Sequence, residues 1–490
     1  MRSVAVLGVL ASCNQIYGLD PTKVIDAGPP PRHVSLTYMI ASGDRTHALD
    51  VDTAVRDVMQ LEAATLDGAQ QLDLLPSYAG AAAVELPEVL AAQPWRLAYT
   101  IAGDVPREVQ NPPAGDLHVV VPMFGPLDRT PVPSNSGYSI TPDQFVNGGN
   151  HAIHRVFTTG VWTEGFADPA PAPATAKLDY PFARATSLFG PIGAPNDAAD
   201  DVVVVDYKID AAGCRVAIGS AETRLALTAN QLAVPQVQPH WEAGTIAVSL
   251  AMDPIAVLER LSFVNAFTDS LGPATMELGL LASDRMPAFE AAPQTPRVLP
   301  GPVLAALTVC PWAPAPPVVP TMPAFHESAL SSEFTPVLHA EASIVRAADG
   351  LQLVSGMAVV TARSGKLYAP VFAAPSVATA TFAGADLFGP TDDVAMTATG
   401  GTLAFTLSGG ADYVEVTLHQ IAGGALTPVR RYTVFGTTVE VAPSTLAAAS
   451  TYVFEIRTFT GRPGAPLGDF RIATLPQAMV TMFTRTFVTP

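Results

Sequence analysis

The chain has 490 residues, 49% of them hydrophobic and only 14% charged, so it can bury a large core and global disorder is excluded. Its formal net charge of −18 excludes nucleic acid as a partner and direct electrostatic binding to an anionic membrane, because both are negatively charged. No apolar run reaches the roughly 18 residues of a membrane-spanning helix, and the length corresponds to about three or four domains.

The N-terminus has the features of a secretory leader. Arg2 supplies a positive charge, Ser3–Leu10 form a short apolar core, and Ala11–Ser12 are the small residues expected before a cleavage site. Residues 13–34 are then rich in glycine and proline, which favours an extended tether over the start of a core.

The segment Leu10-Ala11-Ser12-Cys13 resembles the lipobox of bacterial lipoproteins. This resemblance implies that residues 1–12 are a signal peptide, that acyl chains such as palmitate are attached to Cys13, and that this lipid holds the mature chain at a membrane. Asn14 stands where lipoproteins kept at the inner membrane carry aspartate, which implies the outer membrane of a Gram-negative envelope. The alternative is an apolar N-terminus with an incidental cysteine.

Beyond the tether, most of the chain has the pattern of β-strands. Alternating or β-branched runs recur every 8–15 residues between Gly, Pro, Asn and Asp, which predicts a mainly β protein of several β-sandwich modules in series. The best helical signal is Asp253–Phe267, with Asp253 as N-cap and Pro254 at the first helical position. Thr53–Thr65 is a second, ambiguous helical candidate.

Two proline-rich stretches suggest where the modules are divided. Alternating Pro and Ala favour extended, semi-rigid spacers. The expected organisation is a β-rich domain over 35–167, a linker over 168–175, a β-rich domain over 176–312 with the short helix, a linker over 313–323, a small β segment over 324–390, and a sandwich over 391–490.

The C-terminal hundred residues show the clearest pattern. Alternating strands are separated by turn residues, and Leu446 is followed six residues later by Tyr452, the spacing of a tyrosine corner. This region resembles a fibronectin type III domain, although Leu403-x-Phe405 stands where that family usually has Leu-x-Trp. The resemblance implies a two-sheet sandwich that spaces, displays or binds.

Three cysteines are an odd number for an exported chain. Acylation of Cys13 would leave Cys214 and Cys310, which can form a disulfide worth about 4–5 kcal/mol in the chain-entropy model, since it closes a loop of about 100 residues. Two buried free thiols are the alternative.

Few residues suggest chemistry. His151 and His154 would share a helical face for metal binding, but the following residues favour a strand, on which positions three apart point to opposite faces. Asp197, Asp200 and Asp201 are the densest acidic group and suggest a calcium loop, with a solvated turn as the alternative. Apart from calcium, no cofactor is expected.

Aromatic side chains and motifs give no catalytic signature. Trp95 and Tyr99, with Trp162, Trp241 and Trp312, suit a core better than a sugar or peptide site. No serine-hydrolase elbow, P-loop or zinc-protease motif is present.

These features predict a lipid-anchored envelope protein that acts in adhesion, ligand display or scaffolding, with an unknown protein or carbohydrate as ligand. The alternatives are an exported hydrolase whose catalytic domain lies within 35–312 and carries the C-terminal sandwich as an accessory, and a structural component of an envelope complex. The lack of a motif favours a role without catalysis.

Overall fold

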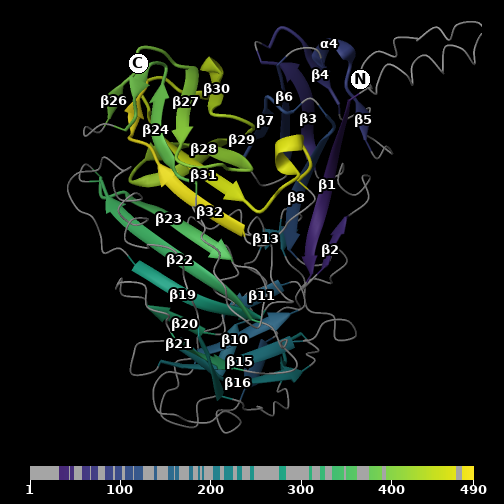
Figure 1. Cartoon of the computed structure of the whole chain (residues 1–490), viewed down its shortest axis with the longest axis vertical. Coiled ribbons are helices and arrows are strands. Elements are labelled where there is room, and N and C mark those ends of the chain that lie inside the picture. The colour runs from purple at the N-terminus through teal and green to yellow at the C-terminus, as the bar shows by residue number, and fades with distance from the viewer. Residues whose placement is uncertain are drawn as a thin grey trace, which may run out of the picture.

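The structure is a computed structural model that describes residues 32–42, 45–48, 58–66, 68–74, 83–91, 94–101, 105–113, 115–124, 137–140, 153–158, 161–164, 176–179, 186–187, 190–191, 202–209, 215–223, 229–233, 243–247, 275–282, 308–311, 321–325, 334–346, 349–360, 375–388, 393–470 and 477–490. Within these ranges the chain is mainly β, which confirms the predicted fold class (Figure 1).

The N-terminal elements are β1 (His33–Ser42), β2 (Arg45–Ala48), β3 (Val58–Thr65), β4 (Gln71–Asp73), β5 (Val84–Glu85), the short helix α4 (Glu88–Ala91), β6 (Trp95–Ile101), β7 (Arg107–Gln110) and β8 (Leu117–Phe124). β1 pairs with β2 and β5 in antiparallel and with β8 in parallel orientation. β4, β3, β6 and β7 are neighbours in that order in a second sheet.

One helical candidate of the sequence is wrong where the structure describes it. Residues 58–65 of the Thr53–Thr65 segment form strand β3, paired with β4 and β6. Leu61, Ala63 and Ala64 are all buried and Glu62 is half-buried, so apolar side chains are buried on both faces of this strand. The Asp253–Phe267 candidate lies outside the described residues.

The middle strands are β9 (Gly137–Ile140), β10 (Ile153–Thr158), β11 (Val161–Glu164), β12 (Ala176–Asp179), β13 (Thr186–Ser187), β14 (Gly190–Pro191), β15 (Val202–Ile209), β16 (Arg215–Thr223), β17 (Leu232–Ala233), β18 (Ala243–Ala247), β19 (Thr275–Ala282), β20 (Thr308–Pro311), β21 (Thr321–Phe325), β22 (Phe334–Val345) and β23 (Gln352–Val360). Most of them lie below the N- and C-terminal strands in the view of Figure 1.

The C-terminal elements are β24 (Val377–Phe382), β25 (Ala385–Asp386), β26 (Val394–Ala395), β27 (Gly401–Leu407), β28 (Tyr413–Ala422), β29 (Ala425–Val434), β30 (Thr438–Val441), the 3₁₀ helix η6 (Pro443–Thr445), β31 (Thr451–Thr460), the 3₁₀ helix η7 (Ala465–Leu467), β32 (Gln477–Phe483) and β33 (Phe487–Val488). One sheet has the order β25-β24-β27-β30. The other has β29, β28, β31 and β32 as successive neighbours. We call these two sheets the C-terminal sandwich.

Local sequence explains the tightest turn of this sandwich. Ala422 pairs with Ala425 at the end of the β28–β29 hairpin, and the two residues between them are Gly423 and Gly424. Both have positive φ, 58° and 74°, which matches the twist of a two-residue hairpin and is a conformation that L side chains rarely adopt.

Aromatic side chains fill the space between the two sheets. Phe382 on β24 lies 5.2 Å from Phe454 on β31 and 5.1 Å from Phe487 on β33, measured between ring centroids. Leu403 and Phe405 on β27 are also buried. Phenylalanine therefore serves in this core at the position where the fibronectin pattern expects tryptophan.

Strand pairing is continuous across the predicted divisions of the chain. β10 pairs with β15 across the 168–175 segment, and β19 pairs with β22 across 313–323. β23 pairs with β32 across residue 390, and β24, which precedes residue 391, pairs with β27. A proline-rich segment removes only its own backbone donors, so strands on either side of it remain free to pair. The C-terminal sandwich, as defined above by its strands, therefore includes residues on both sides of residue 391.

The sheet β29-β28-β31-β32 is extended at both edges. β7 pairs with β29 at one edge, and β23 pairs with β32 at the other. Both edges of the sandwich sheet are therefore hydrogen-bonded within the chain, which removes the unpaired edges that promote aggregation. In the described ranges, no helix is long and apolar enough to cross a membrane.

Candidate functional site

β7 joins the N-terminal strands to the C-terminal sandwich. It runs antiparallel to β6 and parallel to β29, so that Glu108 lies opposite Ala98 on one side and Tyr432 on the other.

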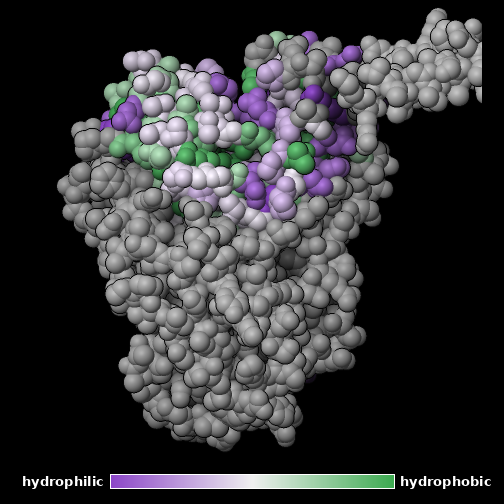
Figure 2. All heavy atoms as spheres, in the orientation of Figure 1, coloured by the Kyte–Doolittle hydropathy of each residue, from purple (hydrophilic) through white to green (hydrophobic). Residues whose placement is uncertain are grey.

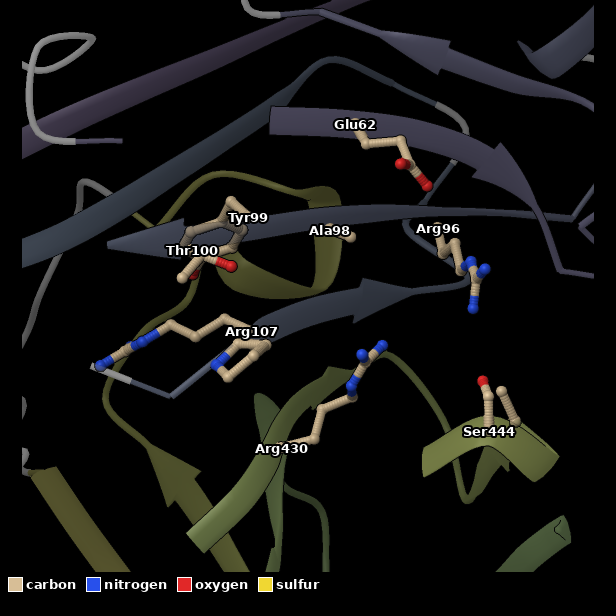
Figure 3. Close-up of a pocket in the computed structure, with 10 residues that line it drawn as sticks. Glu62, Arg96, Ala98, Tyr99, Thr100, Arg107, Arg430 and Ser444 are labelled. Atoms are coloured by element: carbon tan, nitrogen blue, oxygen red, sulfur yellow. The ribbon is translucent and has the colours of Figure 1, made fainter. Parts of the chain in front are cut away.

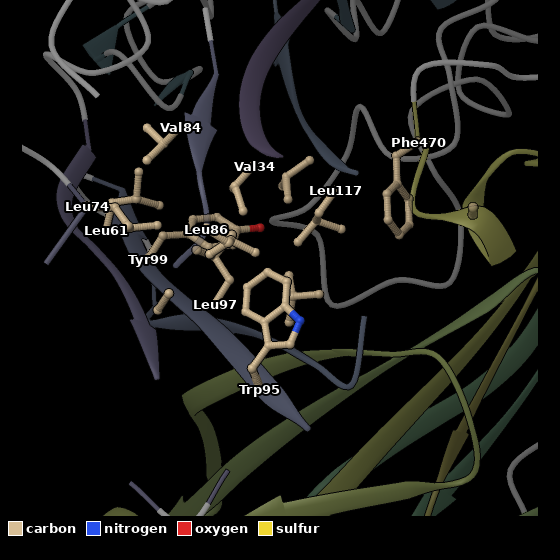
Figure 4. Packing of buried hydrophobic residues seen from close by; sticks show 14 of the residues in the cluster. Val34, Leu61, Leu74, Val84, Leu86, Trp95, Leu97, Tyr99, Leu117 and Phe470 are labelled. Atoms are coloured by element: carbon tan, nitrogen blue, oxygen red, sulfur yellow. The ribbon is translucent and has the colours of Figure 1, made fainter. Parts of the chain in front are cut away.

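Apolar packing also joins the two regions, since one buried cluster combines residues of both (Figure 4). Its N-terminal members include Val34, Leu61, Trp95, Leu97, Tyr99 and Leu117, and its C-terminal members Tyr413, Phe459, Phe470 and Met479. Trp95 and Tyr99 are thus core residues, as the sequence favoured.

A cavity of about 170 Å³ lies at this junction (Figure 3). Glu62 of β3, Arg96 and Thr100 of β6, and Arg430 of β29 line it, together with Ser444 of η6. Glu62 pairs with Ala98 in the sheet register, and Ala98 pairs with Glu108. Since side chains directly opposite each other in a sheet share one face, these polar groups come from the same side of the β3-β6-β7-β29 sheet. We call this space the junction cavity.

Glu108 is the charged centre of the junction. Only 1% of its side chain is exposed, and its carboxylate lies 2.9 Å from a terminal nitrogen of Arg430 and 3.5 Å from one of Arg96. Gln110 Nε2 also donates to Glu108 Oε1 at 2.5 Å. A buried carboxylate without such partners would carry a large desolvation cost, so these three contacts explain how the charge is accommodated.

Gln110 ties β7 to the second sheet of the sandwich. Its Nε2 donates to the carbonyl oxygen of Glu440 and its Oε1 accepts from the N–H of Glu440, both at 2.8 Å. Glu440 is on β30, so one amide side chain takes the place of a strand neighbour. The junction is therefore held by groups that lie more than 300 residues apart in sequence.

Tyr432 adds a neutral group beside the charges. Burial raises the pKa of its phenol above the usual range, and the negative charge of Glu108 adds to the rise. The hydroxyl therefore stays protonated at neutral pH.

In Figure 2 strongly hydrophilic residues gather over the N-terminal strands, whereas the C-terminal sandwich shows a paler surface, so the polar character of the junction continues on its N-terminal side.

The two arginines of the cavity have hydrogen-bonding capacity left. The Nε atoms of Arg96 and Arg430 are buried without an acceptor among the described residues, while 20% and 28% of these side chains remain exposed. Guanidinium groups only donate and stay charged at any physiological pH. These groups therefore cannot act as a general base.

A second polar group lies on β28 and β31. His419 Nε2 is 2.7 Å from Glu455 Oε2, and Arg457 Nε donates to Glu455 Oε1 at 2.6 Å. Burial alone would raise the pKa of Glu455, but the charge of Arg457 and the contacts with His419 outweigh it and lower the pKa to about 2. Glu455 is therefore ionised at neutral pH and holds Arg457 in the sheet.

A serine and a histidine also meet on neighbouring strands. Ser35 Oγ and His118 Nδ1 are hydrogen-bonded at 2.5 Å across the parallel β1–β8 pair. Ser35 is only 6% exposed, and Asp116 accepts from the backbone N–H of His33. The pair therefore links the two strands.

The remaining predicted sites fall largely outside the described residues. Cys13, Cys214, His151 and the group Asp197, Asp200 and Asp201 lie there, as do Trp241 and Trp312. Cys310 is in β20 and His154 in β10, where the predicted strand is confirmed. Among the residues that the structure describes, no three His, Cys, Asp or Glu side chains gather as metal ligands do.

The tyrosine corner is present as a hydrogen bond. The backbone N–H of Ala447 donates to the hydroxyl of buried Tyr452 at 2.7 Å. The sequence missed Arg96, Glu108, Gln110 and Arg430. The only hint of this site in the sequence was the segment Arg107–Gln110, which contains two charged residues. In the structure this segment is strand β7, and all four of its residues are buried.

Comparisons with known proteins add no family to this picture. A scan against models of protein families found no match, and a search of curated proteins found no similar sequence.

Proposed function

We propose that the chain is a lipid-anchored protein of the bacterial outer membrane that acts in adhesion, ligand display or scaffolding. The observation that carries this proposal is the Leu10-Ala11-Ser12-Cys13 motif. Residues 14–32 separate this motif from the first strand, β1, which begins at His33. Acylation of Cys13 would anchor the chain, and the glycine- and proline-rich residues would space the folded strands from the lipid.

The C-terminal sandwich supports a display role. Its strand neighbours, β24-β27-β30 in one sheet and β29-β28-β31-β32 in the other, suit a fibronectin type III-like domain, and the Ala447–Tyr452 hydrogen bond suits the tyrosine corner of such domains. Domains of this type space or bind, and they rarely carry chemistry. The buried Ser35–His118 pair gives the hydrolase alternative no support, and that alternative remains a prediction for residues 35–312.

Strand register supports the predicted disulfide between Cys214 and Cys310. Arg215 pairs with Val309 and Val216 with Thr308 in antiparallel orientation. Arg215 follows Cys214 and Val309 precedes Cys310 in the sequence, so the described pairing brings the chain neighbours of the two cysteines together. Opposed residues of antiparallel strands are about 4.5–5.5 Å apart at Cα, within the range of disulfides. We therefore expect a Cys214–Cys310 disulfide in the exported protein.

The anchor is tested by fractionating cells of a Gram-negative host that produce the full chain. Wild-type protein should sediment with outer membranes and incorporate labelled palmitate. Cys13→Ser should abolish the label and prevent removal of residues 1–12, because the modified cysteine is what the lipoprotein pathway processes. Cys310→Ser is the matched control and should keep both label and membrane association. Palmitate incorporation in Cys13→Ser equal to wild type contradicts the proposal.

The disulfide is tested separately. Peptide mapping of the mature protein without reduction should recover Cys214 bonded to Cys310. Two thiols that alkylate readily in the native protein would reject the disulfide and leave the lipid anchor standing.

A further inference from the structure

We propose that the tip of η7, formed by Pro466 and Leu467, rests on the lipid surface to which the chain is anchored. This inference rests on the proposed lipid anchor and adds a second point of membrane contact. Leu467 is 73% exposed, against 36% for Leu72, the other exposed large hydrophobic residue in the described ranges, and Pro466 is exposed as well. In Figure 2 a small, strongly hydrophobic spot lies among hydrophilic residues where Figure 1 shows the yellow coil of η7. Contact with an apolar surface would remove this side chain from water.

The surrounding loop holds this tip in one conformation. Ala465 of η7 is fully buried. Gly464 and Gly468 flank η7 and leave no room for a side chain, because a Cβ atom at either would lie 2.5 Å from a backbone oxygen. The guanidinium of Arg462, which is 5% exposed, donates to the carbonyl oxygen of Phe470 at 2.9 Å and closes the loop. The tip therefore has little conformational freedom to lose on contact.

The tip lies beside the place where the tether enters the fold. Gly468, the residue after the tip, packs against the carbonyl oxygen of Asp116. Asp116 accepts from the backbone N–H of His33, the first residue of β1, at 2.8 Å. Residues 14–32 connect this point to Cys13, and a chain of that length spans between roughly 25 Å when flexible and roughly 60 Å when extended. A lipid on Cys13 would therefore keep the tip within reach of the membrane.

The tether makes a weak contact sufficient. Full burial of one leucine side chain corresponds to roughly a ten- to hundredfold gain in binding, which would not hold a free protein on a membrane. Once the lipid is inserted, the tip no longer has to find the membrane from solution, and its contact becomes an intramolecular event with a high effective concentration. One apolar tip is then enough to orient the anchored chain.

Charge favours a zwitterionic lipid surface. The net charge of −18 is repelled by anionic lipid, and the tip itself carries no charge. The expected partner is therefore a neutral phospholipid such as phosphatidylcholine, contacted by apolar burial that salt does not screen.

The test replaces the natural anchor, so that it does not depend on acylation. Residues 13–490 with Cys13→Ser carry a hexahistidine tag in place of residues 1–12 and bind through it to phosphatidylcholine vesicles that contain a nickel-chelating lipid. In Leu467→Trp the new indole should lie at the lipid. Brominated phosphatidylcholine should then remove most of the fluorescence that this indole adds to the unsubstituted chain, equally at low and high salt.

Gln352→Trp is the matched control. Gln352 is exposed on β23, which lies away from the N-terminal strands in Figure 1, so its indole should keep its fluorescence. Quenching of Leu467→Trp no greater than that of Gln352→Trp would overturn the proposal, whether or not palmitate labels Cys13, so failure of the tip contact is distinguished from failure of the anchor. A change from dimer to monomer in lipid-free solution caused by Leu467→Asp, measured by sedimentation, would assign the tip to self-association and reject the lipid contact.

Discussion

The two faces of the β29-β28-β31-β32 sheet are buried by different means. On the inner face Phe454 of β31 stacks with Phe487 and meets Phe382 of the opposite sheet, all within the C-terminal sandwich. On the outer face residues from distant parts of the chain cover the sheet. Trp95 and its neighbours pack with Tyr413 and Phe459 in one cluster, and Leu351 and Leu353 pack with Val453 in another.

Along β31 the charged groups lie on the outer side. Along β31, Val453, Glu455 and Arg457 alternate with Phe454 and Ile456, so the ionised glutamate lies on the face opposite the aromatic core. Around Phe454 and Phe487 the inner face is closed by apolar contact, which contains no titrating group. The outer face combines apolar clusters with hydrogen-bonded charges, which specify orientation and respond to pH. The comparison predicts that changes on the two faces have different signatures.

The largest effect is expected in the core between the inner face and the opposite sheet, where Leu403 of β27 lies. Leu403→Ala should lower the free energy of unfolding of the full chain by about 2–5 kcal/mol, because Leu403 is fully buried and the substitution leaves a cavity. Leu467→Ala is the matched control, since Leu467 is 73% exposed, and should change stability by less than about 0.5 kcal/mol. Urea denaturation followed by far-ultraviolet circular dichroism measures both. Equal effects of the two variants would show that Leu403 is not a core residue.

An intermediate effect is expected on the outer face as pH falls. The folded-state pKa of Glu455 is lowered to about 2 from an ordinary value of 4.5. Its contribution to stability is therefore complete above pH 4.5 and is lost as pH falls from 4.5 toward 2, in total on the order of 3 kcal/mol. The free energy of unfolding should drop through this window in the wild type.

Glu455→Gln isolates this contribution. The variant should be less stable than wild type at pH 7, because Arg457 and His419 lose their carboxylate partner. The difference between the two proteins should shrink as pH approaches 2, where the wild-type carboxylate becomes protonated. A difference that stays constant from pH 7 to pH 2.5 would contradict the lowered pKa. Leu403→Ala should show such a constant difference, since no titrating group is removed.

Sequence reasoning succeeded where the determinants are local. The alternation along Leu403–Leu407 and the six-residue spacing from Leu446 to Tyr452 each lie within one strand or turn. The structure has a strand with Leu403 and Phe405 buried at the first place and a hydrogen bond at the second. The assignment of Thr53–Thr65 failed because a short apolar segment has too little periodicity to separate a helix from a strand, and pairing with β4 and β6 decides the outcome.

The junction could not be read from the sequence for a physical reason. Glu108 and Arg430 are 322 residues apart, and neither belongs to a motif. A charged residue in a strand is normally a solvated position, so its burial becomes apparent only when the partners are brought together by β7–β29 pairing. The division into modules stays a prediction, because composition reveals linkers but not the pairing of strands on either side of them.

The smallest effect is expected at the tyrosine corner. Tyr452→Phe removes one hydroxyl and leaves the backbone N–H of Ala447 without its acceptor in the turn after η6, while the ring keeps its stacking against Phe487. Loss of one such hydrogen bond should lower the free energy of unfolding by about 1–2 kcal/mol. Urea denaturation measures this loss, and amide hydrogen exchange should show faster exchange confined to Ala447 and its neighbours. Tyr413→Phe is the matched control, since it removes a hydroxyl from the outer-face cluster, where Tyr413 stacks on Phe459. If Tyr452→Phe alters exchange at Ala447 no more than Tyr413→Phe does, the hydroxyl does not hold the turn, and the corner is maintained by apolar packing of the ring alone.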